Sequence, residues 1–337
     1  MSVDLKTRYL GFELENPLVV SASPLGGHLD TLEQLEAAGA AAVVLPSLFE
    51  EQIEHDDLSM HWTFEAGAGS HAEATSSYLP ELGAYATGPG DYLEHVAAAK
   101  ATLSIPVIAS LNGSSPGGWI RYARLIEEAG ADALELNLYA IETDPDTNAL
   151  AVEQRLLELV GAVRASIDIP LAVKVGPYFT AFAHTARELV AAGADGLVLF
   201  NRLVQPDLDP AGLRIGPSVQ LSTRDELRLP LRWTAILKGR IDASLATTGG
   251  VHEPIDVIKA LLAGADVTML ASALLRNGPT WLTRLTIGMS VWLEEHEYAS
   301  VEQMKGSMSQ ISCPDPAAFE RASYMHALTS FARPETS

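Results

Sequence analysis

The chain has 337 residues, of which 47% are hydrophobic and 19% are charged. That length suffices for a large buried core, and the composition excludes a disordered protein. The 22 lysines and arginines stand against 43 acidic residues, a formal net charge of -21 that disfavours binding to nucleic acids or anionic membranes. No apolar stretch reaches the ~20 residues that a membrane-spanning helix needs.

Metal and disulfide chemistry have little support in the sequence. Cys313 is the single cysteine, which excludes a disulfide framework, and we expect it to be structural. The histidines show neither HxH nor HExxH spacing, so no metal site is predicted, and His184, His252 and His326 are expected at the surface or in helix packing. The first residues lack a charged-then-apolar leader, and we expect a cytoplasmic protein.

Eight short apolar runs recur along the chain, most of them separated by helix-like stretches. Four follow an Ala-Gly-Ala step, as at Ala38–Ala40, where the glycine supplies the left-handed residue that ends a helix. In chain order the runs are NPLVVSAS, AAVVLPS, IPVIASLN, DALELNL, IPLAVKVG, DGLVLFN, IDASLATTGG and DVTMLAS. They are continuously apolar rather than alternating, which indicates strands buried on both faces of a parallel sheet.

Eight such units predict an α/β fold, a (β/α)8 TIM barrel, as one domain over residues 1–337. A doubly wound open sheet is the competing arrangement. The preceding stretch LKTRYLGFELE predicts an N-terminal hairpin that plugs the barrel bottom. Long βα-loop insertions are expected at Phe49–Pro89 and Gln205–Asp242, on the face where such barrels place active sites. Helices are expected around Trp119–Ala129, Ala151–Ser166, Phe182–Ala192 and Glu253–Ala263.

Lys174 lies inside the apolar run IPLAVKVG. Because an unpaired buried ammonium is costly, it should meet an anion or have a lowered pKa. Three roles stay open. Lys174 could pair structurally with a carboxylate such as Glu135, oppose negative charge on a ligand, or act as a nucleophile that forms a Schiff base, as in aldolase-type lyases.

Two further sets of residues stand at predicted strand ends. Thr248, Gly249 and Gly250 end the seventh run and Ala271 and Ser272 end the eighth. Loops after the last two barrel strands commonly bind phosphate through bare backbone N–H groups, although a tight turn without a ligand is the alternative. Amides at three other strand ends can bond the donors and acceptors of a flat heterocycle; they belong to Asn112, Asn137 and Asn201.

Together these pieces resemble the dihydroorotate dehydrogenase family of FMN-dependent barrels, in particular its less characterised dihydroorotate dehydrogenase-like branch. The most specific match is VKVGPYF followed by FNR and TGGV, and the other matching pieces are NPLVVSAS, PVIASLNG, LELNL and GADVTMLASALLRNGP. The resemblance implies an FMN-dependent dehydrogenase acting on CH–CH bonds, with oxidation of dihydroorotate to orotate in pyrimidine biosynthesis as the default reaction. Another small unsaturated or cyclic substrate is the alternative.

The resemblance also implies roles for individual residues. Lys174 would face the N1/C2-carbonyl edge of the flavin, where hydride transfer leaves negative charge. The other cofactor-binding residues would be Ala22, Ser23, Ser47, Asn112, Asn137, Thr248, Gly249, Gly250, Ala271 and Ser272. The substrate would contact Asn137, Asn201 and Ser77.

The chain departs from the family pattern at three places. The family's catalytic loop reads Asn-Leu-Ser-Cys-Pro-Asn in many members, and its Cys or Ser removes the substrate C5 proton. Here Ala140 stands at that position and has no group that accepts a proton. Pro46 precedes Ser47 where the family has a lysine, and Ser76–Leu79 replaces an asparagine-rich loop.

A substitute base could come from the same loop. Tyr139 is adjacent to Ala140, but a phenol with a pKa near ~10 needs help from a cation such as Lys174. The remaining candidates are Glu142, Thr143 and Asp144, or no base of this kind exists.

Partners are predicted by analogy with the family. A homodimer is expected, and the electron acceptor would be soluble: fumarate, a quinone, dioxygen or a protein. The loss of the base at Ala140 leaves a further possibility, a flavin-binding subunit without turnover that serves another redox protein.

Overall fold

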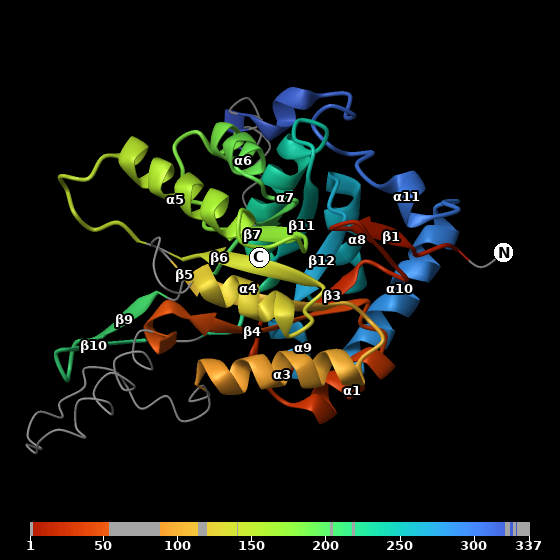
Figure 1. Cartoon of the computed structure of the whole chain (residues 1–337). Helices are drawn as coiled ribbons and strands as arrows, with labels where there is room; N and C mark the ends of the chain where they lie inside the picture. Colours follow the sequence, from red (N-terminus) through yellow and green to blue (C-terminus); the bar gives the residue numbers. More distant parts are fainter. Residues whose placement is uncertain are drawn as a thin grey trace, which may run out of the picture.

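The computed structural model describes residues 3–53, 88–113, 120–139, 141–202, 205–217 and 220–320, together with 324, 325 and 328. A closed parallel barrel forms its centre, and helices surround it (Figure 1). The barrel strands are β3 (Leu18–Val20), β4 (Ala42–Phe49), β5 (Val107–Gly113), β6 (Ala133–Leu138), β7 (Leu171–Val175), β8 (Gly196–Leu199), β11 (Ser244–Thr248) and β12 (Val267–Leu270).

The sheet closes because β12 pairs with β3, so the strand order runs β11-β12-β3-β4-β5-β6-β7-β8. The prediction of a (β/α)8 barrel is therefore confirmed, and the doubly wound alternative is wrong. Each of the eight predicted apolar runs coincides with one barrel strand, and β4 and β5 extend one or two residues past their runs.

Helices surround the barrel: those between barrel strands cover the outer side of the sheet, and the last two along the chain pack against other helices. The helices are α1 (Leu29–Ala37), α3 (Pro89–Thr102), α4 (Ile120–Glu128), α5 (Ala149–Arg164), α6 (Phe182–Ala191), α7 (Arg228–Leu237), α8 (Pro254–Ala263), α9 (Ser272–Asn277), α10 (Trp281–Glu295) and α11 (Val301–Met304). None of the helices that the structure describes is long and apolar enough to cross a membrane.

The N-terminal hairpin, β1 (Thr7–Tyr9) and β2 (Phe12–Leu14), covers one end of the barrel. Tyr9, Leu10 and Leu14 are buried in one cluster with inward-facing side chains of the barrel strands, such as Ala133 and Ala172. The predicted plug is therefore confirmed.

The structure describes most of only one of the two predicted insertions. Residues 54–87 of Phe49–Pro89 lie outside the described residues. The segment Gln205–Asp242 begins with an extra hairpin, β9 (Pro206–Asp209) and β10 (Arg214–Pro217), which projects from the side of the barrel opposite β1 (Figure 1). Its second half is not an insertion, because α7 is the regular barrel helix between β8 and β11.

Candidate functional site

The side chain of Lys174 points into the barrel near the carboxyl end of β7. Side chains alternate along a strand, and Ala172, two residues earlier, belongs to the inward-facing cluster. Lys174 is only 6% exposed. Its Nζ donates to Glu135 Oε1 at 3.2 Å and to Ser21 Oγ at 3.4 Å. The structural pairing with Glu135, one of the roles predicted for Lys174, is present.

The same lysine lines a cavity of about 190 Å³ at the strand ends, here called the Lys174 cavity. Residues at the carboxyl ends of β3, β7, β8, β11 and β12 converge on it, as expected for parallel barrel strands. Eight of the predicted site residues line it: Ala22, Lys174, Asn201, Thr248, Gly249, Gly250, Ala271 and Ser272.

The glycine pair after β11 has two separate structural roles. Both residues have left-handed backbones, with φ of +86° at Gly249 and +77° at Gly250. A Cβ on Gly250 would lie 2.4 Å from the backbone nitrogen of Leu227, whereas a Cβ on Gly249 would have no neighbour within 4 Å. Gly250 is thus needed for packing, and Gly249 keeps the backbone open toward the cavity.

Sequence reasoning did not identify a polar link beside this turn. Ser222 lines the cavity, donates its backbone N–H to Ser272 Oγ at 3.0 Å, and its hydroxyl lies 3.1 Å from His252 Nε2. His252 is 7% exposed, and burial lowers its pKa, with a further lowering by Arg276. His252 is therefore a buried loop residue next to the glycine turn, and a surface position is wrong. The predicted contact with a helix is present, because Trp281 Nε1 of α10 donates to the His252 carbonyl at 2.8 Å. The position of His252 directly after Gly249-Gly250-Val251 was the available signal.

Asp256 fixes the loop that follows the glycine turn by hydrogen bonds. Its carboxylate accepts hydrogen bonds from Arg224 at 2.7 and 2.9 Å and from the backbone N–H groups of His252 and Glu253. Burial opposes the charged form of Asp256, but the hydrogen bonds from Arg224 and from the backbone outweigh it and lower the pKa. The charged carboxylate thereby fixes the start of α8 and the loop after the glycines.

Replacing Asp256 with asparagine should lower the free energy of unfolding at pH 7 by about 2 kcal/mol, because charge-assisted bonds at a buried site are lost. A lowered folded-state pKa means that the stabilisation is present above the unfolded pKa of ~4 and disappears as pH falls through the folded value. Urea unfolding from pH 7 downward checks both statements. Asp225→Asn, at an exposed carboxylate paired with Arg228, is the matched control and should change stability little.

Three asparagines lie near Lys174 at the carboxyl ends of neighbouring barrel strands. Asn112 is the register neighbour of Asn137, and Asn137 is the register neighbour of Lys174. Asn201, directly after β8, donates from Nδ2 to Asn137 Oδ1 at 2.6 Å. The structure therefore brings the predicted amides together beside the lysine.

The remaining predicted residues have mixed surroundings. Ser23 is buried, and its hydroxyl has no hydrogen-bond partner within the part of the chain that the structure describes. Ser47 Oγ is bonded to Ser110 Oγ on the neighbouring strand at 2.8 Å. Tyr139 follows β6 directly and is half-buried. Ser77 and Ala140 lie outside the described residues.

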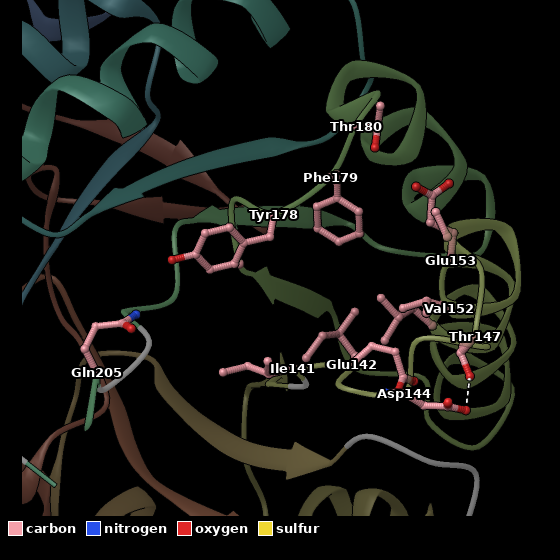
Figure 2. A pocket seen from close by; sticks show the side chains of 14 residues that line it. Ile141, Glu142, Asp144, Thr147, Val152, Glu153, Tyr178, Phe179, Thr180 and Gln205 are labelled. Carbon is pink, nitrogen blue, oxygen red and sulfur yellow. Dashed lines mark hydrogen bonds between the residues drawn. The ribbon is translucent and has the colours of Figure 1, made fainter. Parts of the chain in front are cut away.

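A second cavity, of about 520 Å³, lies beside the loops after β6 and β7 (Figure 2). Figure 2 shows Ile141, Glu142 and Asp144 along one wall and Tyr178 and Phe179 along another. The described residues that line it include none of those that line the Lys174 cavity. Two of the predicted bases, Glu142 and Asp144, therefore face a different cavity.

These two acids are also engaged by neighbours. Glu142 Oε2 accepts from Arg155 at 2.8 Å, and that hydrogen bond lowers the pKa of Glu142. Asp144 accepts from the backbone of Asp146 and from Thr147, which lower its pKa. A carboxylate with a lowered pKa is a weaker proton acceptor, so both are poor candidates for a general base. The described residues contain no group of three or more His, Cys, Asp or Glu side chains that could hold a metal ion.

The buried Lys174 and the glycine turn line one cavity at the carboxyl ends of the barrel strands. Enzymes with this fold place their active sites at that end of the barrel. The family model described as dihydroorotate dehydrogenase matches residues 4–209, and the chain belongs to this family.

Three similar proteins carry dihydroorotate dehydrogenase names. A dihydroorotate dehydrogenase B (NAD(+)) catalytic subunit from Methanothermobacter thermautotrophicus is 25% identical over 315 residues, covering 90% of this chain and 97% of that protein. A putative dihydroorotate dehydrogenase A (fumarate) from Aeropyrum pernix is 31% identical over 60% of this chain and 67% of its own. The Thermoplasma acidophilum catalytic subunit is 24% identical, over 90% of this chain and 98% of its own.

Proposed function

We propose that this protein is an FMN-dependent oxidoreductase acting on CH–CH bonds, with oxidation of dihydroorotate to orotate in pyrimidine biosynthesis as its default reaction. The observation that carries the proposal is that the buried ammonium of Lys174 and the open backbone of Gly249 line one cavity. Family membership supports the same reaction class.

The residues around the Lys174 cavity fit FMN. Gly249 offers backbone that no side chain covers, next to Ala271 and Ser272 at the start of α9, which suits a phosphate group. The ammonium of Lys174, which lines the cavity, provides a polar partner for a flavin ring. The buried hydroxyl of Ser23, unbonded among the described residues, follows directly after the lining residue Ala22. Ala22, Ser47, Asn112, Asn137 and Thr248 complete the proposed cofactor site.

Bound FMN would supply the acceptor for the hydride of dihydroorotate C6; the C5 proton would pass to a base of this chain as the C5–C6 double bond of orotate forms. Lys174 would stabilise the negative charge that the cofactor gains. Asn137 and Asn201, already joined at 2.6 Å, would orient the substrate by hydrogen bonds, with Ser77 as a further contact.

Tyr139 is the proposed base. It is half-buried directly after β6, two residues after Asn137, whereas Glu142 and Asp144 line the other cavity and have lowered pKa values. A different small unsaturated or cyclic substrate is the second candidate, because Ala140 occupies the position of the family's Cys or Ser and Arg202 adds a guanidinium to the cavity lining. A Schiff-base lyase has less support, since Lys174 is paired with Glu135 and a charged amine is not a nucleophile.

The proposed molecule is a cytoplasmic homodimer that works with a redox partner protein. The name "catalytic subunit" of the Methanothermobacter thermautotrophicus relative supports a partner subunit. Sedimentation with and without co-expressed partners tests the assembly.

The decisive experiment is an anaerobic titration of the FMN-loaded protein with dihydroorotate, followed by visible absorbance. Bleaching of the flavin band is expected, and Tyr139→Phe should slow it by about 10²–10⁴-fold because the proton acceptor is lost. Bleaching by dithionite but not by dihydroorotate would identify a working flavin site for another substrate. Failure to bind FMN would rule out the proposal altogether.

A further inference from the structure

Glu135 is a buried carboxylate directly below the proposed flavin site. It belongs to β6 and is fully buried. Ala133, two residues earlier, belongs to the inward-facing cluster, so Glu135 also points into the barrel. Its register neighbours are Ser110 and Ala172, one inward layer below Asn112, Asn137 and Lys174.

Lys174 is the partner of this carboxylate. Within the described part of the chain, no other basic side chain lies within ion-pair distance of Glu135. Its second oxygen, Oε2, has no hydrogen-bond partner among the same residues. The 3.2 Å contact between Glu135 Oε1 and Lys174 Nζ is therefore the main electrostatic compensation that Glu135 receives.

Toward the barrel bottom, the pair faces a buried and uncharged side chain. Tyr9 of the N-terminal hairpin is 1% exposed at the barrel bottom. Burial raises the pKa of Tyr9, and the carboxylates of Glu135 and Asp266 raise it further, so the phenol stays neutral. In such a low-dielectric interior, two opposite charges 3.2 Å apart largely cancel each other's field.

We propose that Glu135 is a positioning residue that fixes the ammonium of Lys174 and offsets its positive charge, thereby keeping the reduction potential of bound FMN low. This inference rests on the proposed function, since it requires FMN in the Lys174 cavity. A lone ammonium would favour the negatively charged, reduced cofactor strongly, whereas an ammonium paired with a carboxylate favours it less. Glu135 would thus set which electron acceptors the reduced protein can serve.

The test is the reduction potential of FMN bound to Glu135→Gln, measured spectrally against dyes of known potential. Glutamine keeps the shape and one acceptor oxygen but removes the charge. We expect the variant to bind reduced relative to oxidised FMN at least about tenfold more tightly than the wild type. For a two-electron couple this corresponds to a positive shift of about 30 mV.

Glu13→Gln is the matched control, because the Glu13 side chain is exposed on the outer side of the N-terminal hairpin and pairs with Arg8 at the surface. It makes the same change in net charge and should leave the potential unchanged. Glu135→Asp keeps the charge but moves it away from Lys174 Nζ, so it should shift the reduction potential of FMN by a smaller positive amount. This variant replaces Glu135→Gln in the test if Glu135→Gln does not fold.

The outcomes separate the two proposals. If the wild-type protein does not quench the fluorescence of added FMN, the proposed function fails. If the wild type binds FMN but the potential of the Glu135 variants is unchanged or more negative, the inference about Glu135 is wrong while the proposed function stands. A positive shift that Glu13→Gln reproduces would also overturn it.

Discussion

Replacing Lys174 with methionine should slow reduction of bound FMN by dihydroorotate at least ~100-fold. The ammonium of Lys174 is a buried cation in the lining of the cavity, and a preorganised charge opposite a developing anion contributes about two to three orders of magnitude in rate. Methionine fills a similar volume, so the loss would report charge rather than packing. Anaerobic stopped-flow absorbance measures the effect.

The control for this experiment is Lys6→Met, since Lys6 is exposed and pairs with Glu15 at the surface. In this variant, dihydroorotate should reduce bound FMN at the wild-type rate. Unchanged reduction in Lys174→Met would contradict the proposed role. Borohydride in the presence of candidate carbonyl compounds tests the Schiff-base alternative, and a lysine adduct at Lys174 would support a lyase instead.

The largest effect on stability is expected for Gly250→Ala. The substitution places a Cβ 2.4 Å from the backbone nitrogen of Leu227 and forces an alanine to a φ of +77°. Steric overlap costs about 1–3 kcal/mol and a left-handed backbone about 1–2 kcal/mol. We expect the free energy of unfolding to fall by about 3 kcal/mol, measured by urea denaturation of the apoprotein.

Gly249→Ala is the matched comparison, because its φ is +86° but its Cβ would meet no atom within 4 Å. It should cost only the backbone strain, about 1–2 kcal/mol, yet weaken FMN binding by placing a methyl group in the cavity. Equal destabilisation by the two substitutions would show that Leu227 does not constrain the turn.

The barrel could be predicted because its strands are buried on both faces. Runs such as DGLVLFN and DVTMLAS are continuously apolar, and the glycines Gly193 and Gly264 mark the helix ends before them with φ of +117°. The division of Gln205–Asp242 into an exposed hairpin and a regular helix was not foreseen. All four residues of β9 are exposed, so the hairpin has no buried face that would impose an alternation of apolar and polar residues on its sequence.

The candidate site was predicted in part for a similar reason. Polar residues at strand ends, such as Lys174 and Gly249, stand out against apolar sequence. The contribution of Ser222 and His252 depends on contacts between loops 30 residues apart, which no local pattern contains. The pairing of Glu142 with Arg155, 13 residues later on α5, likewise became visible only in the structure.

The hairpin at the barrel bottom also affects how the chain can fold during synthesis. Thr7 Oγ1 donates to the carbonyl of Asp266, and the backbone of Asp4 exchanges hydrogen bonds with Ala299 and Val301. At 5–20 residues per second, a ribosome needs roughly 15–60 s to make the residues between these partners. Until then Tyr9 and its apolar neighbours have no finished barrel to cover. The apolar side chains of the hairpin therefore stay without their barrel partners until the last barrel strand has been made.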